Sequence, residues 1–301
     1  MSETAEALQR KINSARELKS VVRTMKSLAA LSIVQYERSV HSLADYYRAV
    51  ELGLAACFRE EAIARAWADP DRPLTGTLTA AIVFGSDQGL VGQFNDHLSR
   101  FVLSELNKRP GDKAIWAIGE RIYARLQDAG LRPRRLYSVP NSVAAITPLV
   151  SKILIDHKTM RENVEVYIFH NQPRSGASYE PAKQRLLPLD EEWQRTLSRI
   201  KWPTKMLPQV VGDGKPTIFA LIREYLFVSL FKACAESLMS ENASRLAAMQ
   251  RAQRNIDDLL QVLQAAFHQK RQTSIDAELF DVISGFEVLA TKQHRNGAKK
   301  T

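Results

Sequence analysis

The architecture follows from residues 217–289, which read TIFALIREYLFVSLFKACAESLMSENASRLAAMQRAQRNIDDLLQVLQAAFHQKRQTSIDAELFDVISGFEVL. This stretch contains no proline, and its single glycine, Gly285, lies near its end. As one helix, at about 1.5 Å per residue, it would be about 110 Å long. Because that length exceeds the diameter of a domain of this size, we expect a rod that pairs with another helix.

A second helix is predicted at the other end of the chain. Residues 3–67 contain no proline and one glycine, Gly53. Steps of alternately four and three residues from Leu8 trace a heptad seam with thirteen apolar positions out of fifteen. The seam comprises Leu8, Ile12, Ala15, Lys19, Val22, Lys26, Ala29, Ile33, Tyr36, Val40, Leu43, Tyr47, Val50, Leu54 and Cys57.

The same steps along the C-terminal stretch give a matching seam with eleven apolar positions out of fourteen. It comprises Leu221, Tyr225, Val228, Lys232, Ala235, Met239, Asn242, Leu246, Met249, Gln253, Ile256, Leu260, Leu263 and Phe267. Two such helices separated by a domain can fold back as a long antiparallel two-helix coiled coil. An ordinary helical bundle is the alternative, although bundle helices rarely exceed about 25 residues.

The middle of the chain has a different composition. All twelve prolines and ten of the thirteen glycines lie between Pro70 and Pro216. The pattern predicts strands at 78–84, 114–118, 134–139, 164–170 and 179–187, and helices at 94–108, 120–129 and 142–160. We therefore expect an inserted Rossmann-like α/β domain whose last two strands form a hairpin. The predicted divisions are helix 1–69, α/β domain 70–190, linker 191–216, and helix with basic tail 217–301.

Beyond Phe267 the seam breaks at Lys270 and a narrower apolar stripe follows. It contains Ile275, Leu279, Val282, Ile283, Phe286 and Leu289. An apolar helix tip that no segment of its own chain covers is expected to be covered by another protein. The alternative is that residues 1–20 of the same chain cover it.

Composition limits the classes of protein. The net charge is +9, with basic residues concentrated on both predicted long helices, so an acidic partner is expected. No apolar run approaches the roughly 20 residues of a membrane span, and no signal-peptide core is visible at the start. We therefore expect the protein to stay in the compartment where it is made. Cys57 and Cys234 are expected to be buried, reduced thiols.

The chain offers no defensible catalytic constellation. Residues 85–95, GSDQGLVGQFN, follow a predicted strand and open a helix, where a phosphate-binding loop could lie. They match neither GxGxxG nor GxxxxGK[ST], and no lysine lies at the helix start. The six histidines show no metal-ligand spacing. We expect no cofactor and no metal.

Three motifs together carry a family resemblance. They are the basic helix INSARELKSVVRTMKSLAA at 12–30, the loop SDQGLVGQFN at 86–95, and ESLMSENASRLAAM at 236–249 with RQTSI at 271–275. The chain resembles the gamma subunit of a rotary ATP synthase over nearly its whole length. Gln88, Val91, Gln93 and Asp276 depart from the family pattern, which implies a divergent bacterial branch.

The resemblance implies a non-catalytic rotor shaft, present as one copy. The shaft would turn inside a ring of alternating alpha and beta subunits and couple ion flow to ATP synthesis or hydrolysis. Its α/β domain and foot would bind the epsilon subunit and the membrane rotor ring (c-ring). The complex would lie at the cytoplasmic face of the bacterial plasma membrane.

The resemblance also assigns residues to these contacts. The positions implied in coupling and partner contact are Arg23, Met25, Lys26, Arg245, Gln272, Ile275, Leu279 and Ile283. The positions implied in the foot loop are Asp87, Gly89, Gly92 and Asn95. Because a charge is unfavourable in a dry seam, we expect Lys26 to extend to the rim and face an acidic loop of the ring.

Two other classes compete with this interpretation. The charge alone permits a basic coiled-coil nucleic-acid-binding protein, but no aromatic residues are interleaved among the helix arginines. A Rossmann-type enzyme with helical arms would need an anion-binding loop at the first strand–helix turn. Identifying the proteins that co-purify with the chain separates all three.

Overall fold

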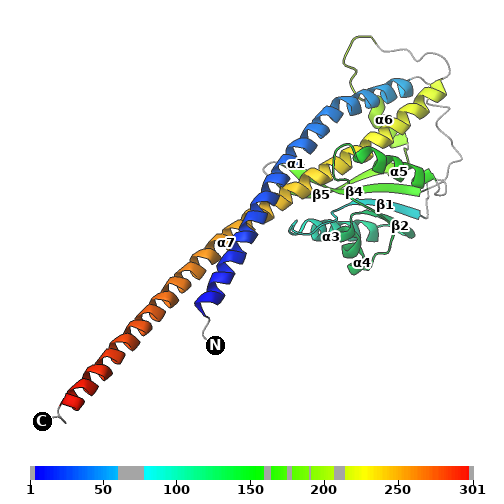
Figure 1. Cartoon of the computed structure of the whole chain (residues 1–301). Helices are drawn as coiled ribbons and strands as arrows, with labels where there is room; N and C mark the ends of the chain where they lie inside the picture. The colour runs from blue at the N-terminus through cyan, green and yellow to red at the C-terminus, as the bar shows by residue number, and fades with distance from the viewer. Residues whose placement is uncertain are drawn as a thin grey trace. The chain divides into compact units, whose positions relative to one another are not determined.

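The computed structural model describes residues 4–59, 78–158, 164–174, 178–189, 191–206 and 214–297. The chain forms two compact units, each built around parts of the two long helices α1 (Ala5–Arg59) and α7 (Gly214–Gly297). Residues 1–26 and 249–301 form the helical unit, and residues 27–248 form the sheet unit. Figure 1 shows α1 and α7 as the two long helices.

The ends of the long helices follow from local chemistry. At the start of α1, Thr4 Oγ1 accepts a hydrogen bond from the Ala7 amide at 3.3 Å, as an N-cap threonine does. Near the start of α7, Pro216 lies in the first turn, where its missing N–H is not needed. The predicted long helices are therefore confirmed, except that residues 60–67 of the first lie outside the described part.

In the helical unit the two helices pack antiparallel around one small core. Ile12, Ala15 and Leu260 are buried, and Ile256, Leu263 and Phe267 pack against them. Lower numbers on α1 lie opposite higher numbers on α7, since Lys26 meets Gln253 while Lys19 meets Asp257. The heptad seam predicted from the sequence is the contact line of this pair.

The sheet unit contains a five-stranded sheet of order β3-β2-β1-β4-β5. Its strands are β1 (Leu78–Phe84), β2 (Asp112–Ile118), β3 (Pro133–Tyr137), β4 (Val164–Arg174) and β5 (Ser178–Leu187). The first four are parallel, and β5 pairs antiparallel with β4 as the expected hairpin. Because β1 lies at the centre with both faces covered, its sequence LTAAIVF is a nearly continuous apolar run.

Helices cover both faces of this sheet. One face packs on α3 (Phe94–Asn107) and α4 (Glu120–Asp128) through a core that includes Val83, Leu98 and Ile122. The other face packs on α5 (Ile146–Lys158), α1 and α7 through Phe84, Tyr36 and Leu238. Figure 1 shows α3 and α4 on the opposite side of the sheet from α7. Long helices thus form part of the core of the α/β domain.

Several predicted boundaries differ from the structure by one to four residues, among them the end of β4, which lies at Arg174 and not at residue 170. The helix expected at 142–160 begins only at Ile146, because residues 142–145 form turns and Pro148 must lie in the first helical turn. The predicted linker at 191–216 contains α6 (Glu191–Ser198). Trp193 and Leu197 of α6 pack on a cluster from α1 and α7 that includes Phe58 and Tyr225.

Candidate functional site

A short section of α7 is enclosed within the sheet unit. Ser237, Ser240, Glu241, Asn242 and Ser244 are all buried although they are polar. Their small or hydrogen-bonded side chains allow the helix to approach the loop that follows β1. The Ser237 hydroxyl donates to the Phe84 carbonyl at 3.0 Å, and the Ser244 hydroxyl donates to the Val91 carbonyl at 2.6 Å. Because this enclosure limits which side chains fit, it explains why the motif ESLMSENASRLAAM is a specific marker of the family resemblance.

A buried histidine–glutamate pair also joins α7 to the sheet. His170 Nε2 on β4 lies 2.8 Å from Glu236 Oε2 on α7, and both side chains are less than 10% exposed. This pair was not predicted from the sequence, where the histidines were considered only as metal ligands. His170 closes the predicted strand 164–170, but nothing in the sequence pairs it with Glu236, which lies 66 residues away.

The loop at 85–95 is held by its own side chains. The Asp87 carboxylate accepts hydrogen bonds from the amides of Glu120, at 2.9 Å, and Val139, at 2.8 Å. Asn95 accepts from the Ser86 amide at 3.1 Å and donates to the Ser86 hydroxyl at 2.8 Å. Asp87 and Asn95, which were assigned to the foot loop, therefore have partners within the chain.

Glycine is required at two close approaches around this loop. A Cβ on Gly85 would lie 2.2 Å from the Cβ of Ile122. Gly119 has a φ of +117°, and a Cβ there would lie 2.6 Å from the Ser86 carbonyl oxygen. The amides of Ser86 and Phe94 are bonded within the loop, so they are not presented to a phosphate.

The outer part of the loop is the part that a partner could reach. Leu90 is 61% exposed and has a φ of +62°, a conformation that is unfavourable for leucine. Gly92, one of the assigned foot-loop residues, has a φ of +57° and is exposed, while Gly89 is half-buried. Local strain at an exposed apolar residue is a feature of contact sites.

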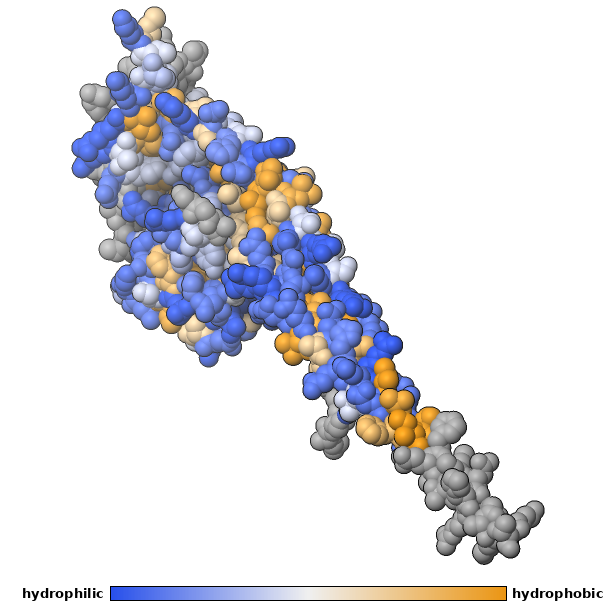
Figure 2. Space-filling model, turned by 90° about the vertical axis from the view of Figure 1, so that its left-hand side faces the viewer, coloured by the Kyte–Doolittle hydropathy of each residue, from blue (hydrophilic) through white to orange (hydrophobic). Residues whose placement is uncertain are grey.

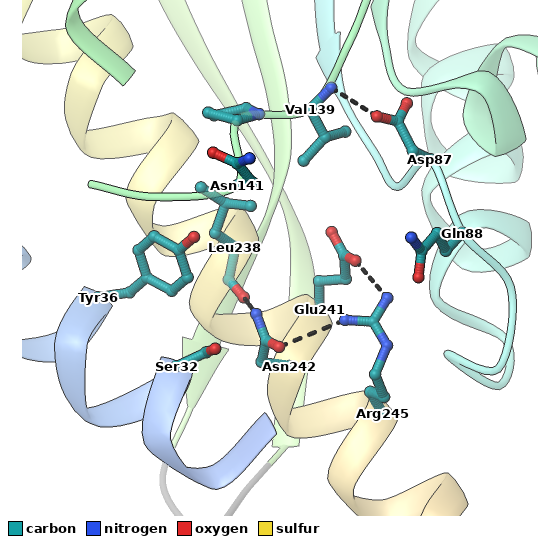
Figure 3. A pocket seen from close by; sticks show the side chains of 11 residues that line it. Ser32, Tyr36, Asp87, Gln88, Val139, Asn141, Leu238, Glu241, Asn242 and Arg245 are labelled. Carbon is teal, nitrogen blue, oxygen red and sulfur yellow. Dashed lines mark hydrogen bonds and ion pairs between the residues drawn. The ribbon is translucent and has the colours of Figure 1, made fainter. Parts of the chain in front are cut away.

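A polar cavity of about 200 Å³ lies where α1, this loop, the segment after β3 and α7 meet. Figure 3 shows Glu241, Asn242 and Arg245 of α7 at its base and Asp87 at its upper rim. It is lined by Ser32, Tyr36, Asp87, Gln88, Val139, Pro140, Asn141, Leu238, Glu241, Asn242 and Arg245. Two assigned residues, Asp87 and Arg245, thus line one cavity.

Arg245 is oriented by its neighbours on α7. Its guanidinium donates to Glu241 Oε1 at 2.6 Å and to Asn242 Oδ1 at 3.3 Å (Figure 3). Burial raises the pKa of Glu241, an effect that Arg245 opposes and the Asp87 charge reinforces. Burial likewise raises the pKa of Tyr36 to about 12. The cavity therefore holds a fixed guanidinium beside a carboxyl group that is costly to ionise.

In the helical unit, the charged seam residues have partners across the helix pair. Lys26 Nζ donates to Gln253 Oε1 at 2.8 Å, and Lys19 Nζ lies 2.6 Å from Asp257 Oδ1. Lys26 was expected to extend to the rim; instead it is half-buried and bonded inside the pair, because its seam position lies level with another polar seam residue. Met25 is half-buried and Arg23 is exposed on the same turn.

The assigned tip residues lie together on α7. Ile275, Leu279 and Ile283 are 46–57% exposed, and Gln272 is also exposed. Figure 2 shows apolar atoms at the surface beside the grey end of the chain. Within the described part of the helical unit, α1 leaves these residues uncovered, so residues 4–20 are not the cover that was considered as an alternative.

The described residues contain no group of three or more metal-ligating side chains and no helix long and apolar enough to cross a membrane. Cys57 and Cys234 are buried thiols that form no disulfide, as predicted.

Comparison with known proteins identifies the family in which this architecture occurs. A family model described as ATP synthase matches residues 4–289. This chain belongs to the ATP synthase gamma-chain family. The ATP synthase gamma chain of Ruminiclostridium cellulolyticum is 23% identical over 96% of this chain and 100% of its own length. That of Syntrophus aciditrophicus is 27% identical over 94% of this chain and 97% of its own length.

The fold has solved counterparts. In a cryo-EM structure of the Euglena gracilis mitochondrial ATP synthase rotor, one chain is 19% identical to this gamma-family chain, with a TM-score of 0.59. The match covers 90% of this chain and 98% of that chain. The identities of 19–27% agree with a divergent member of the family.

Proposed function

We propose that this chain is the central rotor shaft of an ATP synthase and couples ion-driven rotation to ATP synthesis or hydrolysis. The observation that carries the proposal is the match with ATP synthase gamma chains along almost the whole sequence. The helix pair would turn inside a ring of alternating alpha and beta subunits. Its uneven surface would place the catalytic sites of that ring in different states.

A shaft must transmit torque between its domain and its helices. The enclosed section of α7 is suited to this, because the Ser237, Ser244 and Glu236 contacts are directional and buried. Each such hydrogen bond contributes about 1 kcal/mol net, and breaking one leaves a buried polar group unsatisfied at a larger cost. Rotation of the sheet unit about α7 would break several together, so the domain and this section of helix would turn as one body.

The tip and the turn around Lys26 supply the proposed contacts with the ring. Ile275, Leu279 and Ile283 would turn in an apolar sleeve, with Gln272 at its edge. Arg23, Met25, Lys26 and Arg245 remain proposed coupling residues. For Lys26 the role would be indirect, because its ammonium group is bonded to Gln253.

The sheet unit would bind the epsilon subunit and the c-ring. In the loop at 85–95, Asp87 and Asn95 would shape the contact, and the exposed turn at Leu90 and Gly92 would make it. The chain would be present as one copy and be non-catalytic, with the complex at the cytoplasmic face of a bacterial plasma membrane. A fixed internal loop with an exposed apolar turn supports such a docking role.

The test is purification of the affinity-tagged chain from its native host, followed by mass spectrometry of the intact complex. We expect one copy of the tagged chain with several copies each of two nucleotide-binding subunits. A matched control carries the tag on a chain that ends before Ile275 and should yield less of the ring. Recovery of the chain with nucleic acid alone, lost on raising salt, would contradict the proposal.

A further inference from the structure

The polar cavity of the sheet unit contains a buried carboxyl group with one unused oxygen. Arg245 bonds Oε1 of Glu241, at 2.6 Å. Oε2 of Glu241 is buried and has no hydrogen-bond partner among the described residues. Figure 3 shows this second oxygen turned away from Arg245, toward the side of the cavity where Val139 lies. Because a buried polar atom without a partner is unfavourable, this oxygen is placed to bond a molecule that enters the cavity.

The same cavity offers hydrogen-bond donors to an occupant. A guanidinium group has five N–H groups, and Arg245 uses one for Glu241 and one for Asn242, so three remain. Gln88 and Asn141 add side-chain amides to the lining (Figure 3). A cation surrounded by further donors favours an occupant that carries acceptor oxygens, and a carboxylate matches the planar guanidinium best.

The size and the apolar part of the cavity restrict the occupant further. Val139, Pro140 and Leu238 also line it, so part of the occupant can be apolar. Since one water takes about 30 Å³ in the liquid, about 200 Å³ corresponds to about six waters. The cavity therefore suits a ligand of about six non-hydrogen atoms with a carboxylate at one end and a short alkyl chain at the other.

The charges of the cavity require a proton to accompany such a ligand. One positive charge on Arg245 and one negative charge each on Glu241 and Asp87 give a net charge of −1. A bound carboxylate would make it −2, whereas uptake of one proton by Glu241 keeps it at −1. Burial raises the pKa of Glu241, an effect that Arg245 opposes and Asp87 reinforces. Tyr36 and Cys234, which also interact with Glu241, stay uncharged because burial raises the pKa of each.

We propose that this cavity binds a short-chain monocarboxylate together with one proton. The ligand carboxylate accepts hydrogen bonds from the remaining N–H groups of Arg245 and from the proton on Oε2 of Glu241, and its alkyl chain lies against Val139 and Leu238. The proton comes from solvent and no other bond forms or breaks. The site lies wholly within residues 27–248, so it does not depend on the rotor assignment and can be tested on the purified chain.

The test is binding of butyrate, which has six non-hydrogen atoms, followed by ligand-observed NMR. Between about pH 6 and about pH 8.5 the ligand stays ionised, because carboxyl groups in water have a pKa of about 4. The affinity should be millimolar at the acid end, since so small a ligand makes few contacts. Above the folded pKa of Glu241 the dissociation constant should rise about tenfold per pH unit, because one proton binds with each ligand.

Two variants distinguish binding from a structural role, with circular dichroism to check the fold. E241Q cannot titrate but can donate through its amide, so it should bind butyrate as the parent chain does at about pH 6 and show no pH dependence. R245Q should bind about tenfold or more weakly, because the charged donor is lost. R251Q, at an exposed position of α7 outside the cavity, is the matched control and should bind normally.

Four results overturn the proposal: no saturable binding of butyrate at about pH 6, parent binding that does not change up to about pH 8.5, a pH dependence that E241Q retains, or equal affinities of R245Q and R251Q. The rotor assignment would stand in each of these cases, because it rests on the match with gamma chains and is tested by the purified complex.

Discussion

Asp87 shows how one side chain can organise three segments. Its two carboxylate oxygens accept hydrogen bonds from the start of α4 and from the segment that follows β3, while Asp87 itself lies in the loop after β1. A carboxylate suits this position because both of its oxygens are acceptors, whereas an amide offers only one. The same charge adds to the cost of ionising Glu241 across the cavity.

We expect Asp87→Asn to destabilise the chain by about 1–3 kcal/mol, because one of the two amides loses its acceptor. Urea unfolding of the purified chain measures the change. Asp45→Asn, at an exposed position of α1, is the matched control and should change stability little. Equal stabilities of the Asp87 variant and the control variant would contradict this account of the loop.

Glu105 makes a pH-dependent contribution to the stability of the fold. Lys108 and Lys183 hold its pKa at about 2, and Lys183 Nζ lies 2.5 Å from its Oε2. A carboxyl group with a lowered pKa stabilises the fold above its unfolded pKa, and this contribution is lost as the pH falls toward the folded pKa. The stability advantage of the parent chain over Glu105→Gln should therefore be constant above about pH 5.5 and shrink toward about pH 2.

Urea unfolding at a series of pH values tests this dependence on Glu105. Glu37→Gln, at an exposed position of α1, serves as the control. An advantage that stayed unchanged down to about pH 2.5 would show that the lysines do not act through the charge of this carboxylate.

At the scale of elements, one arginine at the end of α1 hydrogen-bonds the end of α6, in addition to the packing of Trp193 on Phe58. The Arg59 guanidinium donates to the Ser198 carbonyl at 3.0 and 3.2 Å and to the Ile200 carbonyl at 2.6 Å. These carbonyls lie at the C-terminal end of α6, where backbone acceptors lack partners within the helix. The end of α1 thus caps a helix that lies far away in the sequence.

We expect Arg59→Gln to loosen α6 with a loss of about 2 kcal/mol, since a half-buried charged donor is removed from three hydrogen bonds. Limited trypsin digestion should then cleave faster at Arg195 and Arg199, within and just after α6. Arg48→Gln, at an exposed site on α1, should leave the cleavage rate unchanged. Unchanged cleavage in the Arg59 variant would mean that the aromatic contacts of Trp193 alone hold α6.

The elements were more predictable than the contacts between them. The apolar run of β1 gives its bounds directly, because a strand covered on both faces has no polar alternation. The His170–Glu236 pair could not be predicted, since its members are 66 residues apart and each has many possible partners. The Lys26–Gln253 bond lies between these cases, because both residues were visible as polar positions of the two seams.

At the scale of the molecule, the exposed tip of α7 separates assembly from folding. Ile275, Leu279 and Ile283 belong to the helical unit, and the core of the sheet unit is built from residues 27–248. A chain that ends before Ile275 should keep its sheet domain but assemble poorly or couple ATP turnover to ion pumping weakly. Circular dichroism should show only the loss of the removed helix. Collapse of the whole spectrum, or full coupling in the truncated complex, would contradict this division.

The covering of one sheet face by α7 has a consequence for biosynthesis. The Ser237 and Ser244 hydroxyls bond carbonyls that precede them by 153 residues, and Leu230 and Leu238 fill the core above β1. A ribosome therefore completes all five strands before it makes the helix that shields them. During that interval Ile82, Phe84 and Trp116 have no α7 above them, and the nascent domain presents an apolar face to solvent. The enclosed section of α7 is thus the last component of a core that begins at Tyr36, so folding of the domain must wait until this section of α7 has been made.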